Sequence, residues 1–189
     1  MNMRELALHV LDLVQNAIEA QANQITLEIK EDCTADLLTI QVLDNGHGMS
    51  ADMVKDVLDP FVTTRITRRI GLGLPLLDMS TGRSGGYLDI QSEPGKGTKI
   101  TAVYQYSHFD RPPLGDIAAT VKTIIALNPE LDFRYSHIVR NQVFSVTTSE
   151  LLAILGDIPL TQPEVLEWLG DYLTVGIANL YGGEKFENC

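Results

Sequence analysis

Hydrophobic and polar positions recur along the first half of the chain with two different periods, each typical of one kind of element. The stretches with helical spacing are 3–20, a short run from Ser50 that ends before Pro60, and 72–81. The stretches that alternate, as half-buried strands do, are 25–30, 38–42, 87–92 and 98–104. This order predicts an α+β fold of two layers, with helices on one face of a mostly antiparallel sheet.

The composition changes at HFDRPPLGD, where adjacent prolines and a glycine predict a boundary. We therefore expect an N-terminal domain at 1–106, a linker at 107–115 and a small α+β domain at 116–189. The last of these holds no cluster of catalytic residue types. Its expected role is contact with a partner or with a second copy of the chain.

Within this second part the pattern predicts both kinds of element. The expected elements are a helix at 116–127 and strands at 132–137 and 142–147. Two further helices are each expected to begin with a capping box, Thr147 with Glu150 and Thr161 with Glu164. The C-terminal part is thus predicted to be ordered.

The first helix carries a narrow polar stripe on an apolar body. At 100° per residue, Glu5, His9, Asp12 and Asn16 fall within a sector of roughly 60°. The stripe either faces solvent or lines a polar cavity. In a cavity, Asp12 and Asn16 would converge from adjacent turns. An amide oxygen suits magnesium, and a carboxylate can position or deprotonate an attacking group.

The charge balance limits the classes of ligand. The formal net charge is -11, which argues against unassisted binding to nucleic acid or an anionic membrane. Arg65, Arg68 and Arg69 form a local basic cluster, either a solvated loop or a contact for a polyanion. No apolar run reaches the roughly 20 residues needed to span a bilayer. Two cysteines are too few for a disulfide framework, so we expect a cytoplasmic location.

Five motifs occur in a recognisable order: DLVQNAIEA, DNGHGM, DPFVTTR, GLGL and GKGT. In this order they resemble the GHKL superfamily of ATP-binding domains, found in gyrase, heat-shock chaperones, histidine kinases and mismatch-repair proteins. The match covers about residues 1–106 and is closest in style to histidine-kinase-like and anti-sigma-factor kinase domains. The resemblance implies a Bergerat-type ATP-binding fold, with ATP or ADP and Mg2+ as ligands.

The resemblance also implies roles around the adenine. Asn16 would ligate magnesium, and Asp44 would accept a hydrogen bond from the adenine amino group. Gly46 and Gly48 would let the backbone pass close to the base. The residues expected to pack on the ring and to support Asp44 through water are Met49 and Thr98.

On the phosphate side, the resemblance implies a hinge, a lid and a helix start. The hinge box contains Phe61 and Thr64, and the basic cluster Arg65, Arg68 and Arg69 falls in the lid over the phosphates. The GLGL residues that open the next helix, where free N–H groups suit phosphate, are Gly71, Leu72, Gly73 and Leu74.

Three features depart from the superfamily pattern. Asp12 stands where gyrase-like members carry glutamate, so its catalytic role as base or positioning carboxylate is open. The lid is short, with Arg69 and Ile70 where many kinases have glycine and a small residue. Finally, no dimerisation helix with an acceptor histidine is expected before the domain, and His9 lacks that context.

Three functions fit these features. The first is a stand-alone kinase module that transfers the γ-phosphoryl to a separate protein partner, as in anti-sigma kinases or split histidine kinases. The second is a regulatory module that senses ATP or ADP and changes partner binding without chemistry. The third, less favoured because no transducer domain is recognisable, is a slow gyrase-type ATPase. The oligomeric state stays open, with a homodimer allowed.

Overall fold

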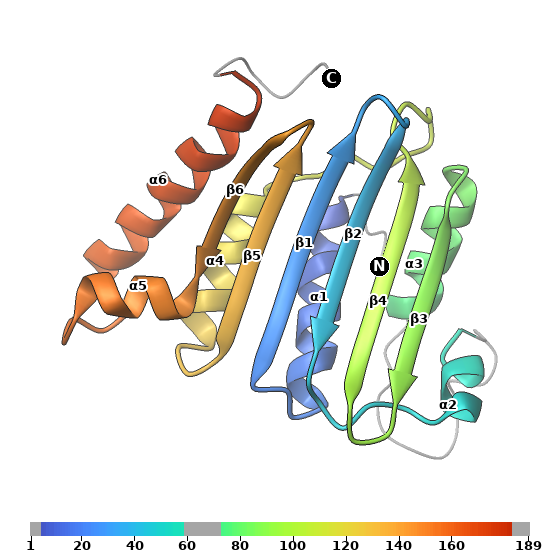
Figure 1. Ribbon diagram of the computed structural model, residues 1–189, viewed down its shortest axis with the longest axis horizontal. Helices are drawn as coiled ribbons and strands as arrows, with labels where there is room; N and C mark the ends of the chain where they lie inside the picture. The colour runs from blue at the N-terminus through green and yellow to red at the C-terminus, as the bar shows by residue number, and fades with distance from the viewer. Residues whose placement is uncertain (1–4, 59–72, 183–189) are drawn as a thin grey trace.

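One mixed sheet of six strands forms the centre of a computed structural model that describes residues 5–58 and 73–182. The strands lie in the order β3, β4, β2, β1, β5, β6 (Figure 1). Their bounds are β1 (Gln24–Asp32), β2 (Leu37–Asp44), β3 (Tyr87–Glu93), β4 (Gly97–Gln105), β5 (Asp132–Val139) and β6 (Gln142–Thr147). Neighbours pair antiparallel except β1 and β5, which run parallel. The predicted α+β fold with a mostly antiparallel sheet is confirmed.

Helices cover one face of this sheet. Their bounds are α1 (Leu6–Glu19), α2 (Ala51–Asp56), α3 (Gly73–Arg83), α4 (Ile117–Leu127), α5 (Thr148–Leu155) and α6 (Pro163–Leu180). Figure 1 shows α1, α3 and α4 behind the sheet, with α5 and α6 toward and beyond the β6 edge. Within the described ranges, no helix is both long enough and apolar enough to cross a bilayer.

Alternation along β1 sorts its side chains between the helix layer and the open face. Ile25, Leu27 and Ile29 are each no more than 1% exposed, whereas Thr26 and Glu28 between them are partly exposed. The same alternation in β2 and the apolar face of α1 complete this core. A slip of one residue would turn every one of these side chains to the wrong face, so burial fixes the strand register.

The segment after the expected boundary extends the same sheet. β5 pairs with β1 so that Ile25 lies opposite Phe133 and Ile29 opposite His137. Phe133 and Ile124 belong to the buried cluster that contains Ile25, and α4 packs against α1. Residues 116–182 therefore share one core with the first part instead of forming a separate layer. Whether residues 1–106 fold by themselves stays a prediction.

The expected linker is held against the first helix. Backbone N–H groups of Leu6 and Ala7 donate to the carbonyl oxygens of Pro113 and Leu114 at 3.0 and 2.9 Å. The first N–H groups of a helix have no partner within it, so these bonds satisfy two of them. The backbone carbonyls of the proline-rich stretch thus cap the N-terminus of α1.

The sequence predicts a side-chain cap at the start of three helices, and the structure contains two of them. Ser50 accepts a hydrogen bond from the N–H of Met53, and Thr147 and Glu150 form the full capping box. The box expected at Thr161 is wrong, because α6 begins one residue later with Gln162 as N-cap and no side-chain cap bond. Proline at the first helical position sets that start through its fixed φ.

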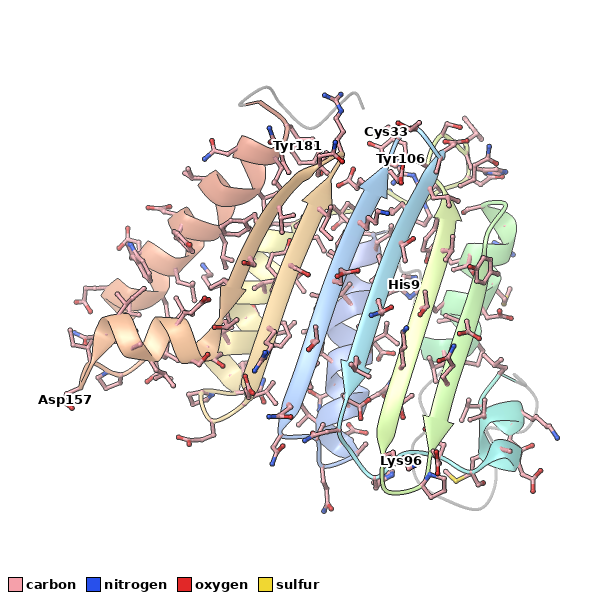
Figure 2. All side chains as sticks on the ribbon, in the orientation of Figure 1. His9, Cys33, Lys96, Tyr106, Asp157 and Tyr181 are labelled. Carbon is pink, nitrogen blue, oxygen red and sulfur yellow. The ribbon has the colours of Figure 1, made fainter. Side chains whose placement is uncertain are left out.

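A buried polar cluster lies where β1, β5 and the end of α6 meet. Glu31 is 5% exposed and accepts from Tyr181, and its Oε1 lies 2.8 Å from Nε2 of His137. The other ring nitrogen of His137 lies 2.9 Å from the Tyr135 hydroxyl. Figure 2 places Tyr181 at the end of the sheet opposite Lys96, which marks the β3–β4 turn.

Candidate functional site

A cavity of about 260 Å³ opens where β2 ends, between the C-terminal half of α1 and the β3–β4 hairpin. Its walls are mostly apolar, with a few polar groups among them, as is usual for small-molecule sites. The residues that line it are Leu13, Asn16, Ala17, Glu19, Ala20, Asp44, His47, Gly48, Met49, Met53, Val57, Leu74, Thr98 and Ile100. Five of the predicted cofactor-binding residues beyond Asn16 are thus brought together with it.

Asp44, the last residue of β2, is the buried charge of this cavity. It is 7% exposed, and its Oδ1 accepts from the N–H of Gly46 at 2.8 Å. Burial raises the pKa of the Asp44 carboxyl above its ordinary value, against the lowering effect of backbone N–H groups of Gly46 and Thr98. An ionised carboxylate only accepts hydrogen bonds, so the cavity holds an acceptor for a ligand N–H.

Thr98 stands opposite Asp44 in the β2–β4 register and opposite Ser92 in the hairpin. The hydroxyl oxygens of Ser92 and Thr98 lie 2.9 Å apart, and Ser92 Oγ also accepts from the N–H of Met49 at 2.8 Å. Ser92 therefore ties the Met49 wall to the hairpin. Sequence reasoning missed Ser92, since only the strand register brings it to this point.

The two glycines of DNGHGM are required by contacts within the protein. Gly48 has φ of +66°, and a Cβ there would overlap the backbone carbonyl of Glu93. A Cβ at Gly46 would lie 2.7 Å from the Ala20 carbonyl oxygen. Gly48 also lines the cavity, whereas Gly46 does not. These contacts within the protein explain both glycines. That they also let the backbone approach an adenine base stays a prediction.

His47 and Asn45 hold the same loop in place. The N–H of His47 donates to the Ala20 carbonyl at 2.9 Å, and its own carbonyl accepts from Gly95. Asn45 Oδ1 accepts from the N–H groups of Asn23 and Gln24, both at 3.0 Å. Asn45 was missed by sequence reasoning, although an Asn beside a glycine is a usual signal of side-chain to backbone bonding.

The polar stripe of α1 divides between different surroundings, so the expectation that it lines one cavity is confirmed at Asn16 only. Glu5 is exposed, and His9 is buried at 3% exposure, where desolvation lowers the pKa of its ring. Asp12 is half-buried and lies outside the cavity lining. The stripe was defined by helix angle, whereas its surroundings are set by which elements pack along α1.

Asp12 lies instead against the start of α3. A Cβ at Gly73 would overlap the Asp12 carboxylate, so glycine is required for this approach. Burial and the charge of Glu19 raise the pKa of Asp12, while a hydrogen bond from Asn16 lowers it. The positive end of the helix dipole favours a carboxylate at this position.

The remaining predicted residues lie outside the described residues. These are Phe61, Thr64, Arg65, Arg68, Arg69, Gly71 and Leu72. Of the GLGL motif, Leu74 lines the cavity and Gly73 opens α3 beside Asp12.

The residues present fit an adenine nucleotide. The buried acceptor of Asp44 and the apolar Met49 and Ile100 suit a flat base with an exocyclic amino group. Among residues 5–58 and 73–182, no group of three or more His, Cys, Asp or Glu could hold a metal. Asn16 thus fits magnesium only as one ligand of an ion that keeps waters and shares substrate phosphates.

Comparisons with known proteins match the first half of the chain to one family. Residues 2–107 match the family described as histidine kinase-, DNA gyrase B- and HSP90-like ATPase. Over 94 residues, 49% of this chain and 20% of the relative, the chain is 32% identical to sensor histidine kinase ZraS of Klebsiella oxytoca. Over 94 residues, 50% of this chain and 23% of the relative, it is 37% identical to sensor protein kinase FleS of Pseudomonas aeruginosa.

A third relative, sporulation kinase C of Bacillus subtilis, is 33% identical over 93 residues, 49% of this chain and 22% of the relative. The chain thus spans less than a quarter of the length of these relatives. Among solved structures, the Aquifex aeolicus MutL ATPase domain complexed with ADP has a TM-score of 0.49 at 14% identity, covering 98% of this chain and 100% of that one. Because the family match covers more than half of its residues, the chain belongs to the histidine kinase-, DNA gyrase B- and HSP90-like ATPase family, the GHKL superfamily.

Proposed function

We propose that the chain binds Mg-ATP in the cavity below β2 and transfers the γ-phosphoryl to a separate protein partner in a regulatory system. One observation carries the nucleotide part: the buried carboxylate of Asp44 lines a mostly apolar cavity. The kinase names of the matched relatives support the transfer part. Such a module would act in the cytoplasm, where ATP and its partner are available.

The cavity residues and Asp12 have separate roles in this proposal. Asp44 accepts from the adenine amino group, and Met49 and Ile100 pack on the ring. Asn16, one helical turn from Asp12, holds magnesium together with the phosphates. When bound, magnesium neutralises phosphate charge and favours in-line transfer. The Asp12 carboxylate lies against Gly73, the first residue of α3. Its role in this proposal is to position the phosphates of ATP through α3, and not to act as a base.

A nucleotide-sensing module without chemistry is the second candidate. The observation that favours it is the place of Asp12, which lies outside the cavity lining and against Gly73. In this alternative ATP or ADP occupancy changes partner binding. A slow gyrase-type ATPase is the least supported of the three functions.

Calorimetric titration with ATP and magnesium tests nucleotide binding. We expect saturable binding that Asn16→Ala weakens in the presence of magnesium, while Gln15→Ala, an exposed neighbour on α1, leaves it unchanged. No affinity for ATP or ADP at millimolar ligand would refute the proposal.

A second experiment separates kinase from sensor. The protein is incubated with γ-labelled ATP and a cell extract, with the Asn16→Ala variant in parallel. A labelled protein band that disappears with the variant supports transfer. Measured ATP binding with no labelled band supports the sensor instead.

A further inference from the structure

The last residue of α1, Glu19, is an acid at a position that disfavours acids. The negative end of the helix dipole lies in the last turn, where a basic side chain is favourable and α1 has none. Burial, and after it the charge of Glu19, raises the pKa of Asp12 on the same helix. Among residues 5–58 and 73–182, no Lys, Arg or His forms an ion pair with Glu19. Neither the helix nor an ion pair thus benefits from this carboxylate.

Glu19 lines the same cavity as Asp44. The two carboxylates differ in burial, because Asp44 is 7% exposed whereas Glu19 is an exposed residue. Gln15 donates to Oε1 of Glu19 at 3.4 Å, a long bond that leaves the carboxylate able to accept others. The cavity therefore offers a bound ligand a second carboxylate, on its solvent side.

Along α1, Glu19 lies between the two ends of the proposed nucleotide. Asn16, the proposed magnesium ligand, comes three residues before it, about 4.5 Å along the helix axis. Ala20, the next residue, accepts from the N–H of His47 at 2.9 Å and so holds the loop that follows Asp44. Figure 1 shows that α1 and β2 end at the same end of the sheet. The part of a nucleotide between a base at Asp44 and phosphates at Asn16 is the ribose.

The ribose is also the part of ATP whose chemistry suits a carboxylate. Its 2′ and 3′ hydroxyl groups are adjacent and can each donate a hydrogen bond, and an ionised carboxylate has two oxygens that only accept. An acidic residue binds a ribose hydroxyl by the same pairing in dinucleotide-binding folds. The phosphates of ATP, in contrast, are anionic and repel an acid.

We propose that Glu19 accepts hydrogen bonds from the ribose hydroxyls and makes the cavity selective for ribonucleotides over deoxyribonucleotides. This contact rests on the proposed binding of Mg-ATP, and it adds the sugar to the contacts with the base and the phosphates. Glu19 takes no part in phosphoryl transfer.

Calorimetric titration of the full-length protein with ATP, 2′-deoxy-ATP and 3′-deoxy-ATP tests the contact in the presence of magnesium. Each deoxy nucleotide lacks one donor. We therefore expect the wild-type protein to bind each of them about tenfold more weakly than ATP, as for the loss of a hydrogen bond to a charged group.

Glu19→Ala should remove this selectivity. The variant should bind the three nucleotides with similar affinity, at least tenfold more weakly than the wild type binds ATP. A merely structural role of Glu19 would weaken all three equally and leave the ratios unchanged. Glu28→Ala, the same loss of an acid on the open face of β1, should keep the wild-type ratios. Thermal unfolding checks folding, and Glu19→Ala should be at least as stable as wild type because it removes an acid from the helix end.

Three results would overturn the ribose contact. The first is equal affinity of the wild-type protein for the three nucleotides, and the second is an unchanged ratio in Glu19→Ala. The third is a loss in Glu19→Ala that is equal for all three and occurs only with magnesium, which would assign Glu19 to the metal. Binding of none of the nucleotides refutes the proposed function itself, whereas equal binding of all three refutes the ribose contact alone, so the two failures are distinguishable.

Discussion

Asp44 is a buried carboxylate, which is unfavourable for folding, and it lines the cavity at the end of β2. The chain places a carboxylate where it is 7% exposed, and desolvation raises its pKa. An acid whose folded pKa is raised is most stabilising to the fold at low pH, and that contribution is lost as pH rises through the folded pKa. At neutral pH Asp44 therefore costs stability. A residue kept at such a cost is a candidate for function.

Replacing Asp44 by asparagine should weaken ATP binding while leaving the fold at least as stable. A hydrogen bond to a charged group contributes about 1.5–3 kcal/mol, so we expect roughly a 10- to 100-fold loss of affinity. Calorimetry measures the affinity and thermal unfolding at pH 7 measures the stability. Asp78→Asn, an exposed site on α3, is the control. Unchanged affinity in Asp44→Asn would remove this residue from the adenine contact.

At the scale of elements, the Glu31 cluster joins strands that are far apart in sequence. Glu31 of β1 is bonded by His137 of β5 and by Tyr181, the residue that follows α6. The bonding is complete when His137 donates from Nε2 to Glu31 and accepts at Nδ1 from the Tyr135 hydroxyl. Burial by itself would raise the pKa of Glu31, but these hydrogen bonds outweigh it and the net pKa is lowered.

Glu31→Gln should lower the free energy of unfolding by about 1–3 kcal/mol at pH 7, because charge-assisted bonds are replaced by neutral ones. A lowered folded pKa contributes stability above the unfolded pKa, and that contribution is lost as pH falls through the folded value. The difference in the free energy of unfolding between wild type and variant should therefore narrow as pH falls below the ordinary glutamate pKa of about 4.3. Urea unfolding at several pH values measures it, with the partly exposed Glu28→Gln as control. A gap constant from pH 7 to pH 3 would contradict the charge-assisted pairing.

At the scale of the whole molecule, the part matching the ATPase family and the part beyond it share one sheet. The matched residues end at 107, yet β5 closes the β1 edge and α4 packs on α1. The cavity at the end of β2 and the β6 edge thus belong to one sheet, with the cavity on the β2–β3 side and β6 at the opposite edge.

A chain ending at Gly115 should fail to fold cooperatively, although it keeps every predicted nucleotide residue. It exposes the β1 edge and the buried surface that Phe133 and Ile124 cover, and an open apolar edge promotes aggregation. Circular dichroism, sedimentation and amide NMR dispersion test this, with the full-length chain as reference. A soluble truncated chain with wild-type dispersion and ATP affinity would show that 1–106 is an independent domain.

Local patterns in the sequence were sufficient for the elements and for much of the site. Alternation predicted β1 and β2 because one face of each is buried, and the Thr147 box predicted the start of α5 because its bonds are local. The motif order predicted that Asn16, Asp44 and Thr98 meet, and they line one cavity. Spacing and local hydrogen bonding are properties of a short stretch, so they can be seen without the fold.

Tertiary structure decided what depends on distant contacts. The parallel pairing of β1 with β5 joined a strand from beyond residue 115 to the sheet, and it gave Glu31 a buried histidine partner. It also placed Asp12 against Gly73 and Ser92 beside Met49. These contacts join residues dozens of positions apart, and their energy comes from burial and pairing that no single stretch contains. The sequence by itself therefore determined the elements and the family, and the packing of the sheet determined which side chains meet.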